Sequence, residues 1–193
     1  MSAVIFNGSL SNQKDLIPLQ KIMEEELKNI GLVPETYLLH QTDIKSCIGC
    51  FKCWDTTPGI CTGVKGDIAN EIAEKVIQSE LLVFLTPLTF GGYSSELKKI
   101  IERLLGLLLP GVNLIKGESH HRKRYERYPS LIAIAFTEKE DSGEEALFGL
   151  LIDRHSKNFY PPKYKSEIIR DVKNLDSLRA KLKQIINDME LKK

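Results

Sequence analysis

Four closely spaced cysteines are the residues of this sequence whose chemistry is easiest to interpret. They are Cys47, Cys50, Cys53 and Cys61, and together they form the pattern C-x2-C-x2-C-x7-C. Three thiolates at such intervals can curl round one face of an iron–sulfur cubane, and a turn at Pro58-Gly59 can bring in the fourth. The pattern is therefore compatible with a [4Fe–4S] cluster whose four ligands are these cysteines.

Other uses of the four thiols stay open at this point. Zinc fits less well, because structural zinc sites usually pair two C-x2-C knuckles across a longer spacer. Structural disulfides are not expected in a cytoplasmic protein, where thiols are kept reduced. Free thiols that shape a flap beside a cofactor are the remaining alternative, with Trp54 either stacking on that cofactor or packing. We expect the cysteines to act together as ligands or not at all.

A second candidate site is the loop that follows the first predicted strand. Its residues are small, hydroxylic or amide-bearing, and they are Gly8, Ser9, Leu10, Ser11, Asn12 and Gln13. Backbone N–H groups at the start of a helix, with hydroxyl donors around them, make an anion site that a phosphate can occupy. The alternative is that the serines and the asparagine only cap the helix, which is their commoner use.

A third candidate site follows the third predicted strand. It combines rigid, flat and side-chain-free residues, namely Thr86, Pro87, Leu88, Thr89, Phe90, Gly91 and Gly92, followed by Tyr93 and Ser94. The two aromatic rings offer planar contact, and the two glycines let the backbone come close to a ligand. A phosphate loop and a flat apolar slot together suit flavin mononucleotide (FMN), whereas a tight turn with both rings in the core is the simpler alternative.

The elements that position these loops alternate along the chain. Short apolar runs predict strands at 3–6, 81–85 and 131–136. Residues 33–39 predict a second strand, which Pro34 places near an edge, and residues 164–169 predict a weaker one. Apolar residues at three- and four-residue steps predict helices at 16–30, 68–76, 97–109, 143–154 and 175–189. We expect Asp67 to cap the second helix and Pro110 to end the third.

This alternation predicts an α/β fold, a flavodoxin-like doubly wound sheet of five parallel strands in the order 2-1-3-4-5. Helices on both faces would make three layers, and residues 1–193 would form a single domain with a cysteine-containing insertion at about 45–66. In this order ligands bind outside the carboxyl ends of strands 1 and 3, where the loops at 7–14 and 86–94 lie.

Composition and missing motifs exclude several functions. The 27 basic and 26 acidic residues leave a net charge of +1, which argues against nucleic-acid binding through bulk positive charge. The sequence has no G-x-G-x-x-G after the first strand, no Walker lysine motif and no acidic pair in the first loop. The histidines, at 40, 120, 121 and 155, lie outside the two loops, and no protein acid or base is assigned.

The N-terminus lacks an export signal, and the longest apolar run is far too short to span a membrane. We therefore expect a cytoplasmic protein that binds neither membrane nor nucleic acid. The basic segment at 116–127 could grip the 2′-phosphate of NADPH, but a solvated loop or an oligomer contact is the favoured interpretation of such a charge run.

The segment from Thr86 to Ser94, followed by Leu97-Lys98, resembles the flavin loop of the NADPH-dependent FMN reductase family. The resemblance extends from the cysteines to about Leu109, although the family's usual Gly-Ser-x-Arg is Gly8-Ser9-Leu10-Ser11 here. The cysteine pattern also resembles that of iron–sulfur flavoproteins, which hold a [4Fe–4S] cluster next to FMN.

The resemblance implies a flavodoxin-like fold, bound FMN and an NAD(P)H-dependent flavin oxidoreductase that passes electrons to a small-molecule or protein redox partner. It also implies a homodimer or homotetramer. The alternatives are an iron–sulfur flavoprotein that carries electrons, and a non-catalytic redox-sensing module that has lost FMN.

Overall fold

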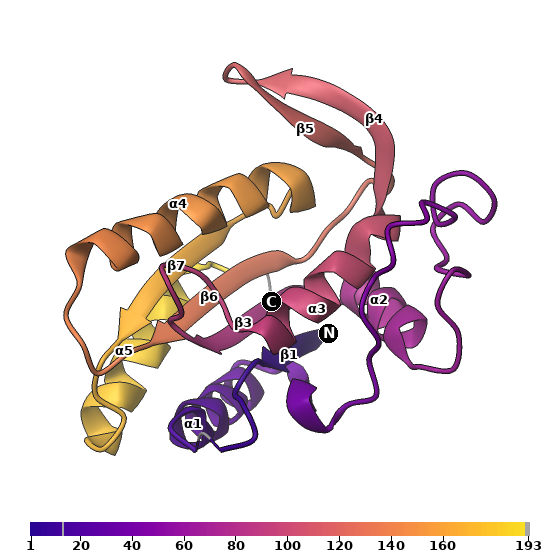
Figure 1. The fold of residues 1–193 in the computed structure, drawn as a ribbon. Coiled ribbons are helices and arrows are strands. Elements are labelled where there is room, and N and C mark those ends of the chain that lie inside the picture. Colours follow the sequence, from indigo (N-terminus) through magenta and orange to yellow (C-terminus); the bar gives the residue numbers. More distant parts are fainter. Residues whose placement is uncertain (13, 192–193) are drawn as a thin grey trace.

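The predicted strands assemble into one parallel sheet. A computed structural model describes residues 1–12 and 14–191. Its parallel strands are β1 (Ser2–Asn7), β2 (Val33–Leu38), β3 (Leu81–Pro87), β6 (Ser130–Phe136) and β7 (Tyr164–Ile169). They lie in the order β2-β1-β3-β6-β7 (Figure 1), which is the predicted order 2-1-3-4-5. The flavodoxin-like prediction is confirmed, and β2 takes the edge position that Pro34 indicated.

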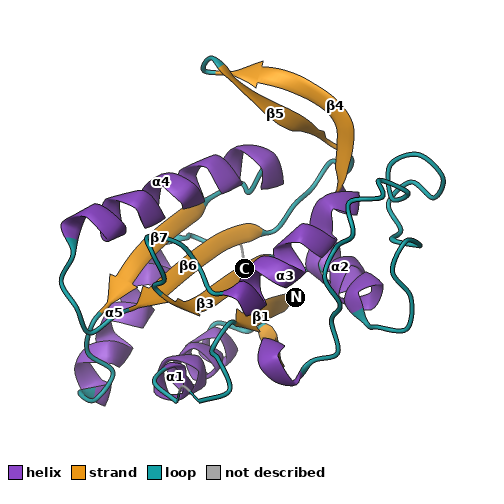
Figure 2. Cartoon of the chain, viewed as in Figure 1, coloured by secondary structure: helices purple, strands orange, loops and turns teal. Residues whose placement is uncertain are grey.

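Helices cover both faces of this sheet and make the three predicted layers (Figure 2). The helices α1 (Leu16–Asn29) and α5 (Leu175–Asp188) pack on one face. The helices α2 (Ala69–Gln78), α3 (Ser95–Arg103) and α4 (Ser142–Phe159) pack on the other. Neighbouring β1 residues point to opposite faces, so Val4 and Phe6 join one core cluster while Ala3 and Ile5 join the other. This double burial explains why the central strands β1, β3 and β6 are nearly continuous apolar runs.

The predicted third helix is too long. Helix α3 ends at Arg103, a 3₁₀ turn follows over Leu104–Leu107, and Leu108 begins a strand. Gly106 weakens a helix at this point, and Leu104, Leu107 and Leu108 reach the core from the turn and the strand as well as they could from a helix. The leucine spacing therefore did not distinguish a continued helix from a turn followed by a strand.

An antiparallel hairpin, which the sequence did not reveal, follows this turn and projects from the sheet. It consists of β4 (Leu108–Ile115) and β5 (Glu118–Lys123), seen at the top of Figure 1. Pro110 does not end a helix but lies at an irregularity of the β4 register, where a missing N–H is tolerated. Much of the basic segment at 116–127, predicted as a solvated loop or an oligomer contact, is thus strand β5 and not a loop, and His120 is buried in it.

Two helix boundaries also differ from the predictions. Helix α4 continues to Phe159, where Tyr160 adopts the left-handed conformation with φ of 47°. Asp67 precedes α2 by two residues, and its carboxylate binds the Arg103 side chain as well as the Ala69 amide. Its main partner is therefore a distant arginine rather than the helix end it was expected to cap. No described helix combines the length and apolar character needed to cross a membrane.

Candidate functional site

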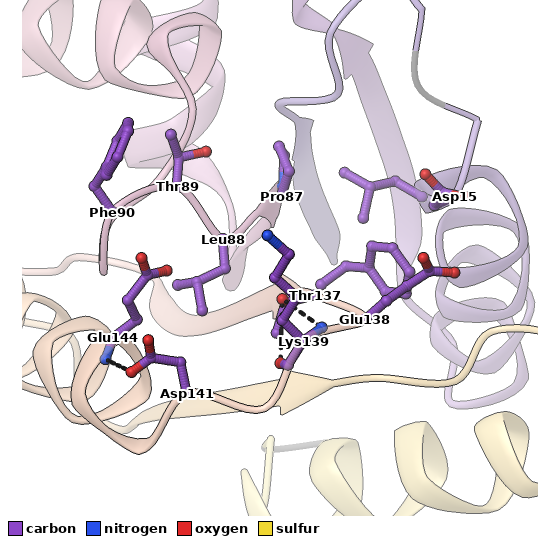
Figure 3. A pocket seen from close by; sticks show the side chains of 12 residues that line it. Asp15, Pro87, Leu88, Thr89, Phe90, Thr137, Glu138, Lys139, Asp141 and Glu144 are labelled. Atoms are coloured by element: carbon purple, nitrogen blue, oxygen red, sulfur yellow. Dashed lines mark hydrogen bonds between the residues drawn. The ribbon is translucent and has the colours of Figure 1, made fainter.

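A cleft of about 520 Å³ opens at the carboxyl ends of β3 and β6, beside the start of α1 (Figure 3). Its walls come from residues 15–16, from 87–90 after β3 and from the segment between Phe136 and Glu144 after β6. The strand order reverses between β1 and β3, which is where doubly wound sheets bind ligands. The volume lies in the range of roughly 300–1,000 Å³ that is typical of small-molecule sites.

A tight turn after β3 presents an aromatic side chain at the edge of this cleft. The Thr89 and Gly92 backbones exchange two N–H···O bonds of 2.9 Å. Between them, Phe90 and Gly91 have φ angles of 49° and 71°, and Phe90 is 91% exposed. A phenylalanine held in the left-handed region is strained, and such strain is typical of ligand-binding sites. The exposed ring is available to stack on a flat ligand.

Buried hydrogen bonds tie the first loop to the third. The Ser94 hydroxyl donates to the Gly8 carbonyl over 2.6 Å, and the Ser94 amide donates to the Thr86 hydroxyl over 2.9 Å. The Gly8 amide donates to the Leu85 carbonyl over 2.7 Å. A Cβ atom at Gly8 would come within 2.7 Å of the Ser94 hydroxyl, so only glycine allows this close approach. These bonds fix the two predicted loops relative to each other.

The structure places the predicted cofactor-binding residues in different surroundings. Those that line the cleft are Pro87, Leu88, Thr89 and Phe90. Those buried in the support behind it are Gly8, Ser9 and Thr86. The exposed ones, on the connection to α1, are Leu10, Ser11 and Asn12. Gly91 and Gly92 lie against α4, so that a Cβ atom added at either position would contact that helix. Gln13 lies outside the described residues.

The sequence reasoning assigned no residue of the wall after β6 to the site. It includes Thr137, Lys139 and Asp141, and Lys139 extends toward Leu88 and Pro87 in Figure 3. The Asp141 carboxylate accepts bonds of 2.9 and 3.0 Å from the first amides of α4, which fixes this segment. The only available signal was topological, because the strand next to β3 in a parallel sheet ends at the same edge.

Charge in the cleft is mainly negative. Among the described lining residues, Asp15, Glu138, Asp141 and Glu144 bring carboxylates, and Lys139 is the single cation. These carboxylates would repel a phosphate. The exposed connection at residues 10–12, before α1, is a better place for one, since it carries no acidic side chain. The cleft thus suits the neutral, flat part of a ligand whose anionic end points to α1.

The cysteine loop, residues 45–66, lies at the other end of α3 from the Phe90 turn. Trp54 donates from Nε1 to the Leu105 and Leu108 carbonyls over 3.1 and 3.0 Å, and its ring lies 4.8 Å from that of His121. The nine residues of α3 separate this contact from the turn by about 13 Å. Trp54 therefore packs, and the described cleft-lining residues include none from the cysteine loop. Within one chain the thiols do not form a flap over the cleft.

The four thiols nevertheless gather in one place. Burial raises the pKa of the Cys53 thiol, and Cys61, Cys47 and Cys50 raise it further because each would repel a thiolate there. The Cys50 sulfur occupies the space of a side chain at Gly63, only 2.1 Å from where a Cβ would lie. The Cys50 side chain in the first half of the cysteine loop thus packs against Gly63 in the second half.

The cysteine side chains, as described, do not have the arrangement of a metal-binding site. In the part of the chain that is described, no three His, Cys, Asp or Glu side chains are arranged to hold a metal ion. A cavity of about 320 Å³ lies beside Cys47 and Gly49, against Glu102 and Leu105. The sulfurs therefore have room to move, and a metal centre would require them to close in.

Similar proteins agree with this geometry. The iron–sulfur flavoprotein of Archaeoglobus fulgidus is 32% identical over 103 residues, which are 53% of this chain and 48% of that protein. The chain thus matches about half the length of this curated relative. The NAD(P)H:quinone oxidoreductase from Methanothermobacter marburgensis has the same fold, with a TM-score of 0.67 at 14% identity over 97% of this chain and 94% of that one.

An FMN-dependent NADH-azoreductase from Bacillus anthracis, solved in complex with FMN, also shares the fold. Its TM-score is 0.60 at 12% identity, over 98% of this chain and 99% of that one. The sequence profile of a family described as NADPH-dependent FMN reductase matches residues 1–123, well over half of the chain. That stretch contains the first loop, the cysteine loop and the turn after β3. The chain belongs to the NADPH-dependent FMN reductase family.

Proposed function

We propose that this protein binds FMN in the cleft at the ends of β3 and β6 and is an NAD(P)H-dependent flavin oxidoreductase. The observation that carries the proposal is the cleft itself, which lies at the strand-order reversal of a family whose members are described as FMN reductases. Its electrons would pass to a small-molecule or protein redox partner.

The residues of the cleft fit the parts of this cofactor. Leu88 and Phe136 supply apolar wall, and the exposed ring of Phe90 supplies a planar face for the isoalloxazine. The exposed loop before α1 offers backbone amides and the Ser11 hydroxyl to the phosphate. Gly8 permits that loop to pack closely on Ser94, because glycine has no Cβ atom to clash with the Ser94 hydroxyl.

FMN, when bound, supplies the hydride and electron chemistry, while the protein orients it and adjusts its electronic properties. Lys139 brings the one cationic charge among the described lining residues, and a cation beside the ring favours added negative charge there. The surrounding carboxylates of Glu138 and Glu144 oppose it. The balance between these charges would set the reduction potential of the bound flavin.

Anaerobic mixing of the FMN-loaded protein with NADPH or NADH tests this function. We expect the flavin absorbance to bleach in a saturable way with at least one of the two nucleotides and to return when an acceptor such as a quinone is added. A loaded protein whose flavin stays oxidised with both nucleotides, but is reduced by dithionite, would contradict the nucleotide-dependent activity.

A second candidate function is that of an iron–sulfur flavoprotein, which couples a [4Fe–4S] cluster to the flavin. The convergence of four thiols and the 32% identical iron–sulfur flavoprotein favour it. The donor set fits, because four cysteine thiolates are the usual ligands of such a cluster. Cys47, Cys50, Cys53 and Cys61 would hold it, and the cluster would supply one-electron transfer.

Iron and sulfide analysis after anaerobic reconstitution tests this second function. We expect about four iron atoms per chain and broad visible absorbance, as a cubane requires. The Cys50→Ser variant should lose most of the iron and keep its FMN, because the cleft lies at the other end of α3. Iron below one atom per chain after reconstitution would contradict the cluster.

A further inference from the structure

The two ends of the cysteine loop are joined by one buried arginine. The Arg103 side chain has 0% exposure and that of Asp67 has 2%. The Arg103 guanidinium binds both Asp67 carboxylate oxygens, over 2.5 and 3.1 Å, and the Lys45 carbonyl over 2.8 Å. The Lys45 amide in turn donates to Asp67 over 2.9 Å. The start and the end of the loop are thus fixed to the end of α3.

A second contact fixes the backbone of one particular cysteine. The Asn70 side chain, in the first turn of α2, accepts from the Cys61 amide and donates to the Cys61 carbonyl, each over 2.9 Å. This reciprocal pair copies the bonding that a neighbouring strand would provide. It holds Cys61 at a defined distance from α2.

The buried arginine, moreover, has a side-chain donor that its pair with Asp67 does not use. The Arg103 Nε atom is buried and has no hydrogen-bond partner among the described residues. A buried guanidinium N–H without a partner costs free energy, so a function for this donor is expected.

The thiols in the first half of the cysteine loop are less constrained. Cys50 is exposed, and Cys47 is half-buried. Between them Gly49 has φ of 66°, and no atom lies within 4 Å of where its Cβ would be. This part of the loop therefore has room to move relative to Cys61.

We propose that Asn70 is a positioning residue that fixes Cys61 as the anchored sulfur of the cysteine loop, whose two ends are held by the Arg103–Asp67 pair. The other three thiols close onto Cys61 when a thiophilic metal centre is built. The proposal rests on the second candidate function for the identity of that centre, but the anchoring itself is a property of the metal-free chain. Cys47 lies beside Glu102 and Leu105, the neighbours of Arg103 at the end of α3, so the unpartnered Arg103 N–H would then be a donor available to the closed set of sulfur ligands.

Limited trypsin digestion of the metal-free protein tests the anchoring. In the Asn70→Ala variant we expect cleavage after Lys52 and Lys65 to be about tenfold faster, because two hydrogen bonds that hold the loop are lost. Asn70→Asp keeps the acceptor for the Cys61 amide, so its cleavage rate should lie between those of the original protein and of Asn70→Ala. Gln78→Ala, an exposed change at the far end of the same helix, is the control and should digest like the original protein. Equal cleavage in all four proteins would overturn the anchoring.

Cadmium titration tests whether the anchored residue acts as a ligand, with Cd²⁺ as the probe. We expect the thiolate-to-cadmium absorbance per bound Cd²⁺ to fall by about one quarter in Asn70→Ala, as one of four thiolates is lost. A change in the amount of Cd²⁺ bound, with the same absorbance per bound ion, would mean structural support alone and would overturn the positioning role. No Cd²⁺ uptake by the original protein would overturn the ligand assignment and the cluster, whereas the digestion result would still decide the anchoring.

Discussion

Replacing Gly91 with alanine is expected to weaken FMN binding by about ten- to a hundredfold and to destabilise the turn after β3. Gly91 has φ of 71°, and an added Cβ would lie 2.7 Å from the Leu147 Cβ and 3.3 Å from the Glu144 carbonyl. The left-handed conformation costs an alanine roughly 1–2 kcal/mol, and overpacking roughly 1–3 kcal/mol more. The turn must move away from α4, and Phe90 and Glu144 on the cleft wall must then separate.

Gly92→Ala is the matched control for this prediction. A Cβ at Gly92 would meet the Thr89 carbonyl at 3.5 Å and Leu151 at 3.7 Å, which are ordinary contacts. We expect its FMN affinity, measured by fluorescence quenching, and its urea midpoint to stay close to those of the original protein. Equal FMN affinities for the two variants would mean that the position of this turn does not govern cofactor binding.

Replacing Asp67 with asparagine is expected to lower the free energy of unfolding by about 3–5 kcal/mol, because it leaves the buried charge of Arg103 without its partner. The control is Glu35→Gln, which breaks the ion pair with Lys75 on the surface, where both side chains are nearly half exposed. That change should cost at most about 1 kcal/mol. Urea unfolding at neutral pH measures both, and similar losses for the two variants would contradict the importance of the buried pair.

The same pair gives the protein a predicted loss of stability in acid. Burial alone would raise the pKa of Asp67, but hydrogen bonds from Arg103 and from the Lys45 and Ala69 amides outweigh it and hold that pKa below its ordinary value. The carboxylate therefore contributes stability above the unfolded pKa of about 3.9, and this contribution is lost as the pH falls through the folded value. The Asp67→Asn variant should lack this part of the acid dependence.

The sheet was predictable because its signals are local and repeated. The three central strands β1, β3 and β6 are buried on both faces, so runs such as 81–85 and 131–136 are apolar throughout and are bounded by helical stripes. The hairpin was not predictable, because its residues carry no local signal that distinguishes it from a continued helix. Leu104, Leu107 and Leu108 are buried in the turn and the strand as they would be in a helix, and no Asn-Gly or Asp-Gly dipeptide marks the hairpin turn, where Lys116 and Gly117 have positive φ.

The candidate site was predictable where one loop carries its own signal. The turn at 87–92 combines proline, an aromatic residue and two glycines, and the structure places its first half on the cleft. The wall containing Thr137 and Lys139 has no such pattern, and its position follows only from the strand order. At Asp67 a local signal was present but indicated the wrong partner. A carboxylate before a helix is typical of a cap, whereas Arg103, 36 residues away in the sequence, binds this one in the fold.

Titration of the flavin-free protein with FMN, followed by the quenching of flavin fluorescence, tests the central claim most directly. The account predicts saturable binding of one FMN per chain, at the cleft formed by Pro87, Leu88 and Phe136. Riboflavin, which lacks the phosphate, should bind more weakly because it cannot use the amides and the Ser11 hydroxyl of the loop before α1. Fluorescence that rises in proportion to added FMN, with no saturable quenching at any protein concentration, would contradict the account.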